Sequence, residues 1–143
     1  MKQDVFIHIK SLIDAGGGND RIEVTTRGRR FKKDGTTYLS YRETDENGFD
    51  GNSVLIKIEN EQRVTISRIG PERSQLLIEA GRRNLCSYST PHGTQMMGIT
   101  CAGIKVRQGA MGCDELSLSY ELDINNNLMS KNQLFITIKE CAN

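Results

Sequence analysis

The feature that most constrains the fold is a strict alternation of apolar and polar residues between Glu115 and Lys139. The apolar positions of its first half are Leu116, Leu118, Tyr120, Leu122 and Ile124, and after an Asn-rich reversal the pattern returns at Leu134, Ile136 and Ile138. A period of two is typical of strands with one buried and one solvated face. Two such strands form a hairpin whose apolar face must be covered by more sheet, so the sequence predicts a β-barrel or β-sandwich.

A second hairpin is predicted around Asp34-Gly35, a dipeptide favoured in two-residue turns because both positions need positive φ. The turn pairs Phe31 with Tyr38 and Gly28 with Tyr41. It places Ile22, Val24, Gly28, Arg30, Leu39, Tyr41 and Glu43 on one face, and Arg27, Arg29, Phe31, Lys33, Tyr38 and Ser40 on the other. Gly28 opposite a tyrosine is typical of a place where a ring covers bare backbone or a strand bends.

Strand-like segments continue along the rest of the chain at short, regular spacing, and no linker or repeat divides them. The segment Glu72–Ala80 fits a short helix or a buried strand, and its strand-forming neighbours favour the strand. We count about ten strands. The expectation is therefore an all-β protein, a single antiparallel β-barrel of about 8–10 strands over residues 1–143.

The charge and hydrophobicity of the chain limit the classes of function that we expect for it. The chain has 19 Lys and Arg against 18 Asp and Glu, a net charge of +1 that argues against a dedicated nucleic-acid or membrane-surface protein. Its first residues form no long apolar run, and no segment approaches the roughly 20 apolar residues of a membrane-spanning helix. We therefore expect a cytoplasmic protein with no membrane partner.

Metal binding and catalysis find little support in the sequence. The four cysteines, Cys86, Cys101, Cys113 and Cys141, are widely spaced, form no C-x-x-C pair, and are expected to be reduced thiols. The loop Asp45–Gly51 resembles a calcium loop, but Phe49 replaces an oxygen ligand and Ile56 replaces the bidentate glutamate. His8 and His92 lie in no catalytic motif. We expect no metal, no cofactor and no enzymatic activity.

Several motifs along the chain carry a family resemblance. They are Arg30–Gly35, Tyr38–Glu43, Glu79–Gly81, Tyr88–Gly93, Gly98-Ile99 and Leu118–Asn126, with Ser130 and Asn132 after them. In these motifs the chain resembles the YwiB-like proteins of Gram-positive bacteria. The resemblance covers nearly the whole chain, except the loop Asp45–Asn52. It implies a calycin-like, up-and-down β-barrel related in shape to lipocalins, and it brings no active site with it. A calycin shape favours ligand binding by analogy of fold alone.

The predicted inner face supplies the candidate ligand site, because a barrel of this size either fills with side chains or holds one small ligand. An inward guanidinium with tyrosine hydroxyls is suited to orienting an anionic or polar molecule. The candidate ligand-binding residues are Arg30, Tyr41, Glu43, Tyr88 and Tyr120. The alternative is that Arg30 and Glu43 lie near the barrel ends and pair with each other or with water.

The predicted outer face supplies a second hypothesis, a protein- or RNA-interaction module. Its residues are Arg27, Arg29, Phe31, Lys33 and Tyr38, in which basic groups flank two rings. The alternative is a solvated strand face whose charges deter edge pairing. For the oligomeric state, the sequence leaves monomer and homodimer open.

Overall fold

A computed structural model describes residues 2–44, 50–71, 73–90 and 93–141, and it shows ten antiparallel strands. The strands are β1 (Gln3–Asp14), β2 (Asn19–Lys33), β3 (Thr36–Thr44), β4 (Asp50–Glu59), β5 (Arg63–Ile69), β6 (Ser74–Glu79), β7 (Arg83–Thr90), β8 (Gly93–Gly109), β9 (Gly112–Ile124) and β10 (Asn127–Glu140). The predicted all-β antiparallel barrel is confirmed. The ambiguous segment after Pro71 contains the strand β6. The described part of the chain holds no helix of the length and apolarity needed to cross a membrane.

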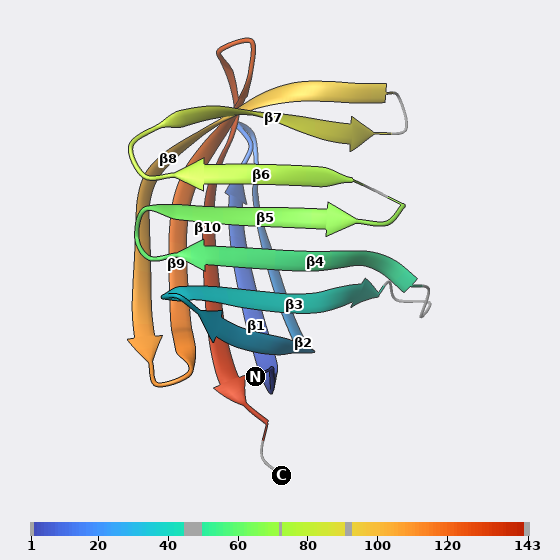
Figure 1. The fold of residues 1–143 in the computed structure, drawn as a ribbon. Helices are drawn as coiled ribbons and strands as arrows, with labels where there is room; N and C mark the ends of the chain where they lie inside the picture. Colours follow the sequence, from blue (N-terminus) through green and yellow to red (C-terminus); the bar gives the residue numbers. More distant parts are fainter. Residues whose placement is uncertain (1, 45–49, 72, 91–92, 142–143) are drawn as a thin grey trace.

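Each strand pairs with its neighbours in sequence, and β1 pairs with β10 to close the barrel. In Figure 1, strands β3 to β7 cross the front of the molecule, while β1, β9, β10 and the later part of β8 run steeply behind them. The two long strands β2 and β8 each run along both directions. The first part of β2 pairs with β1 and its last part with β3, while the first part of β8 pairs with β7 and its later part with β9. This crossing of strand directions is typical of barrels with nearly orthogonal walls.

The predicted first hairpin has the predicted register. Phe31 lies opposite Tyr38 and Gly28 opposite Tyr41, and the turn residues Asp34 and Gly35 have φ of 52° and 82°. Gly28 marks the last pair between β2 and β3. A Cβ atom there would lie 2.6 Å from Ile7 Cδ1 and would also collide with the carbonyl oxygen of Ser40. Only glycine fits where β2 turns away from β3.

The barrel core is filled by branched aliphatic side chains from β1, β3 to β6 and β8 to β10. Fully buried examples are Ile7, Leu39, Ile58, Ile78, Ile99, Leu118 and Ile136. The thiols of Cys86, Cys101 and Cys113 are also buried and unbonded to one another. Burial, with the nearby Asp114 carboxylate, raises the pKa of the Cys113 thiol to about 11. This cysteine therefore packs as a small core residue, and its environment favours the protonated thiol.

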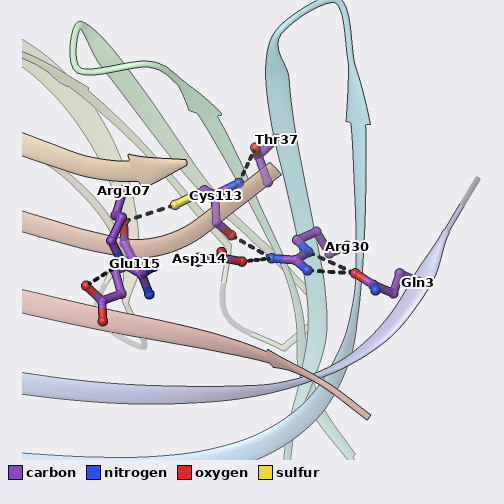
Figure 2. Close-up of polar contacts among 7 residues, drawn as sticks. All are labelled: Gln3, Arg30, Thr37, Arg107, Cys113, Asp114 and Glu115. Atoms are coloured by element: carbon purple, nitrogen blue, oxygen red, sulfur yellow. Dashed lines mark hydrogen bonds and ion pairs between the residues drawn. The ribbon is translucent and has the colours of Figure 1, made fainter. Parts of the chain in front are cut away.

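One buried arginine ties the first three strands to β9 (Figure 2). Arg30 is 2% exposed, and its Nε and Nη2 donate to Gln3 Oε1 at 3.1 and 2.7 Å. Its Nη1 donates to the Cys113 carbonyl at 2.9 Å and to Asp114 Oδ1 at 2.7 Å. The Cys113 amide in turn donates to Thr37 Oγ1 at 2.9 Å. We call this set of contacts the Arg30 clasp.

The wall is least regular between β6 and β7. Within the described residues, Ser74 and Tyr88 form the only backbone register pair between these strands. The Asn84 side chain partly replaces the missing ladder, since its Nδ2 donates to the Leu77 carbonyl at 3.2 Å. The same amide also donates to Glu79 Oε1 at 3.2 Å.

The clasp predicts a large stability effect at Arg30. Replacing Arg30 by alanine leaves the Asp114 carboxylate and a buried carbonyl without their donor, so we expect the free energy of unfolding in urea to fall by about 3 kcal/mol. Arg29→Ala is the matched control. Arg29 is 62% exposed and lies 3.6 Å from Asp4, so its loss should cost under about 0.5 kcal/mol. Equal losses in the two variants would contradict a structural role for the clasp.

The bend of β2 at Gly28 leads to a second prediction about stability. Gly28→Ala forces Ile7 or the β3 backbone to move, and we expect the free energy of unfolding to fall by about 1–3 kcal/mol. Gly17→Ala serves as the control because no atom lies within 4 Å of the added Cβ there. Thermal or urea unfolding of both variants measures the difference, and a Gly28→Ala protein as stable as Gly17→Ala would show that the bend does not need glycine.

Candidate functional site

The barrel wall opens where β2 leaves β3. Strand β1 pairs with β2 from Asn19 to Arg30, whereas β3 pairs with it only from Gly28 to Lys33. Among the described residues, the first part of β2 thus has a neighbour on one side only. We call the resulting opening the mouth. It is bordered by Ile22 and Val24 on β2 and by Tyr41, Glu43, Asn52 and Arg68 on β3 to β5.

A polar cluster occupies the β3–β5 side of the mouth. Tyr41, Val54 and Arg68 are direct cross-strand neighbours, and Val54 is buried, so all three point inward. Arg68 Nε donates to Glu43 Oε1 at 3.2 Å. The buried Asn52 donates from Nδ2 to the same oxygen at 3.1 Å. The cluster is therefore built around one carboxylate that accepts from a cation and an amide.

Two tyrosines lie close to Arg68 from opposite walls. Burial raises the pKa of Tyr41 to about 12, the Arg68 charge opposes that rise, and the Glu43 charge adds to it. Burial also raises the pKa of Tyr120, on β9, and Arg68 again opposes the rise. One guanidinium thus acts electrostatically on both phenols. Tyr120 brings the far wall of the barrel to the cluster.

The β2 side of the mouth is apolar. Val24 lies opposite Ile9 and Ile22 opposite Ser11, and Ile9 packs against the core, so this face of β2 points inward. Ile22 is nevertheless 50% and Val24 46% exposed. They are exposed because β3 does not continue beside them. The β2 side of the mouth is therefore apolar, whereas its β3–β5 side is polar.

A buried hydroxyl lies beside the cluster. Ser74 is the cross-strand neighbour of Arg68, and its Oγ is buried without a hydrogen-bond partner among the described residues. Buried polar groups in proteins are nearly always hydrogen-bonded, so an unpaired hydroxyl next to a guanidinium marks a place suited to a polar guest.

The structure brings together three of the five predicted ligand-binding residues. Tyr41, Glu43 and Tyr120 gather around Arg68 at the mouth. Arg30 instead bonds with Gln3, Cys113 and Asp114, so the alternative pairing of Arg30 with Glu43 is wrong. The backbone of Tyr88 lies in β7 opposite Ser74, while its side chain is outside the described residues. As a ligand site, the predicted set stays a prediction.

Sequence reasoning missed Arg68, Asn52 and Ser74. The signal for Arg68 was present, because it continues the inward series Val64 and Ile66 along β5. A cation at the next inward position of an apolar strand is a candidate for a polar site inside a barrel.

The second predicted set does share the outer face of the first hairpin. Phe31 and Tyr38 stack on each other, with ring centroids 4.6 Å apart and planes 6° apart. Lys57 Nζ lies 6.0 Å from the Tyr38 ring. Arg27 lies over the Phe6 ring at 5.4 Å. Because the two predicted rings face each other, they offer less surface for stacking a nucleic-acid base.

Across the described part of the chain, no three His, Cys, Asp or Glu side chains gather in a way that could hold a metal ion. His8 Nδ1 lies 2.8 Å from Thr25 Oγ1 on the β1–β2 hairpin, away from the polar cluster. His92 and most of the calcium-like loop, residues 45–49, lie outside the described residues.

These features define a ten-stranded, up-and-down antiparallel barrel with a polar cluster at its mouth. The chain belongs to the family described as domain of unknown function DUF1934, whose model matches residues 7–136. The predicted membership of a YwiB-like family is thereby confirmed. No curated protein matches the sequence.

Among solved structures, the fold is similar to the crystal structure of the ywiB protein from Bacillus subtilis. The TM-score is 0.82 at 21% sequence identity, and the match covers 99% of this chain and 94% of that chain. At this identity the likeness concerns the fold.

The Tyr41 environment predicts a pH effect. Because the folded-state pKa is raised from 10.0 to about 12, the contribution of this group to stability is fully present below pH 10 and is lost as the pH rises towards 12. We expect ultraviolet titration of the folded protein to show a late tyrosine ionisation whose amplitude Tyr41→Phe lowers, with Tyr120 contributing the remainder because burial raises its pKa too. Tyr38→Phe, on the outer face, should leave the late step at full amplitude. An undiminished late step in Tyr41→Phe would show that Tyr41 does not contribute to it.

Proposed function

We propose that this protein binds a small amphipathic molecule with an anionic or polar group in the mouth of its barrel. The observation that carries the proposal is an inward arginine, Arg68, which is bonded to Glu43, lies two strands from Tyr41 in the same register, and acts electrostatically on the phenols of Tyr41 and Tyr120. Small-molecule sites combine apolar lining with a few convergent polar groups, and the mouth has this composition.

Arg68 is the proposed anchor for the polar group. Among the described residues, only its Nε is engaged, with Glu43. The two Nη groups remain for a ligand, and a planar guanidinium binds carboxylate or phosphate oxygens through paired hydrogen bonds. The hydroxyls of Tyr41, Tyr120 and Ser74 are the accompanying donors. Glu43 holds the guanidinium in place.

Ile22 and Val24 are the proposed contact for the apolar part of the ligand. Both are β-branched residues on the rim of the core, and their exposed area is the surface that an apolar chain or ring would cover. In this proposal the apolar part of the ligand contacts Ile22 and Val24, and its polar part binds Arg68. These two contacts together fix the orientation of an amphipathic molecule.

We also place the protein in the cytoplasm, as the sequence predicts. The buried, unbonded thiols of Cys86, Cys101 and Cys113 support this location, because reduced cysteines are typical of the cytosol.

The test uses anilinonaphthalene sulfonate, a fluorescent anion with an apolar body. We expect its emission to rise on binding the wild-type protein, and Arg68→Gln to weaken binding by about tenfold through loss of a charge-assisted hydrogen bond. Arg63→Gln is the matched control, since Arg63 lies on the same strand but faces outward and pairs with Glu79. Equal affinity of the wild-type and Arg68→Gln proteins would remove Arg68 from the site and with it the proposal.

A further inference from the structure

We propose that the unpaired edge of β2 takes up an extended, acidic segment of a partner protein as an additional strand. This partner site borders the proposed ligand site and shares Tyr41 with it, but it uses the backbone of β2 and the outer arginines and does not need Arg68.

The first observation is the edge itself. In a barrel that is otherwise closed, β2 from Asn19 to Arg27 pairs with β1 alone, within the residues that the structure describes. Its side chains from Asn19 to Thr25 are all exposed. An unpaired strand carries a row of free N–H and C=O groups and is a template for pairing with another chain.

The sequence of this edge does little to discourage pairing. Between Ile22 and Thr26 it is rich in β-branched residues, and it contains no proline and no lysine. Lysine, proline and bulges are the usual devices that protect exposed edges. The Arg21 and Glu23 side chains bond to each other and so leave the edge near neutrality.

The second observation is a groove at the fork between β2 and β3. It has a volume of about 710 Å³ and is lined by residues 26–29, 40–42, 53–55 and 69. Two of these, Arg27 and Arg29, are arginines of β2, a third arginine, Arg42, has an interaction of its own, and none of the lining residues is acidic. Asp4, outside the lining, lies 3.6 Å from Arg29. A groove with this excess of positive charge favours an acidic partner.

The groove and the edge are continuous. Thr26 and Arg27 belong to both, so a segment paired along β2 runs directly into the groove. There an acidic side chain or a terminal carboxylate meets the arginines. The exposed side chains of Leu55 and Ile69 line the same groove and offer contact to one apolar residue of the segment.

A peptide fits these features better than a nucleic acid does. Strand addition needs alternating backbone donors and acceptors, which only a polypeptide supplies at the spacing of a β-ladder. A nucleic acid would need free ring faces beside the arginines, and Phe31 and Tyr38 are stacked on each other.

The experiment uses two pools of synthetic peptides of about nine residues, the length of the free edge. Both pools combine Val, Ile, Thr, Asp and Glu at random, and one is N-methylated at alternate backbone nitrogens. Each is passed over the immobilised protein, and the retained peptides are identified by mass spectrometry. We expect the unmodified pool to be retained with enrichment of acidic members, and the methylated pool to be retained about tenfold less because it cannot complete the ladder.

Variants locate the site. We expect Arg27→Gln/Arg29→Gln to lower retention of acidic peptides and to weaken its salt dependence. The matched control is Lys105→Gln/Arg107→Gln, two outward cations on β8. Arg68→Gln should retain peptides as the wild type does, which separates this site from the ligand site.

Four binding results would each overturn the proposal. They are equal retention of both pools, no retention of either pool, unchanged retention by Arg27→Gln/Arg29→Gln, and loss of retention in Arg68→Gln. A wild-type dimer in sedimentation analysis that Val24→Lys converts to a monomer would also overturn it, because the edge would then be paired by a second copy of this chain.

Discussion

The bend of β2 at Gly28 is the constraint on which the rest of the molecule depends. This strand must pair with β1 along its first part and with β3 along its last, and these two neighbours run in different directions. A side chain at the point of divergence would collide with Ile7 and the β3 backbone. The mouth, the free edge and the arginine-lined groove all follow from this one divergence, so the features for which we propose functions arise where β2 parts from β3.

Two inward arginines show how partners decide the role of a side chain. Arg30 donates hydrogen bonds to Gln3, the Cys113 carbonyl and Asp114, so it links strands of the barrel and has a structural role. Arg68 has one carboxylate partner, Glu43, which it reaches through Nε. Burial of a cation was a sound reason to search for a site inside the barrel. The number of donors left over is the reason for proposing Arg68, and not Arg30, as the anchor of a ligand.

Local chemistry made much of the fold predictable. The Asp34-Gly35 turn determined the register of the first hairpin, and alternation determined the strands and their inward faces. The partners of Arg30 were not predictable, because Asp114 is 84 residues away and no local rule links them. The exposure of Ile22 and Val24 was likewise hidden. It depends on where β3 stops pairing, which the pattern of β2 alone does not encode.

The pairing of β1 with β10 has a consequence for synthesis. Because β1 is made before β10, it finds one of its two neighbours only when that distant strand has been synthesised. Until then the nascent sheet has an open border at β1, whose apolar residues such as Val5 and Ile7 are fully buried in the finished barrel. Long-range pairing of this kind is intrinsically slow. The nascent chain is thus most exposed to misassociation in the interval between the synthesis of β1 and that of β10.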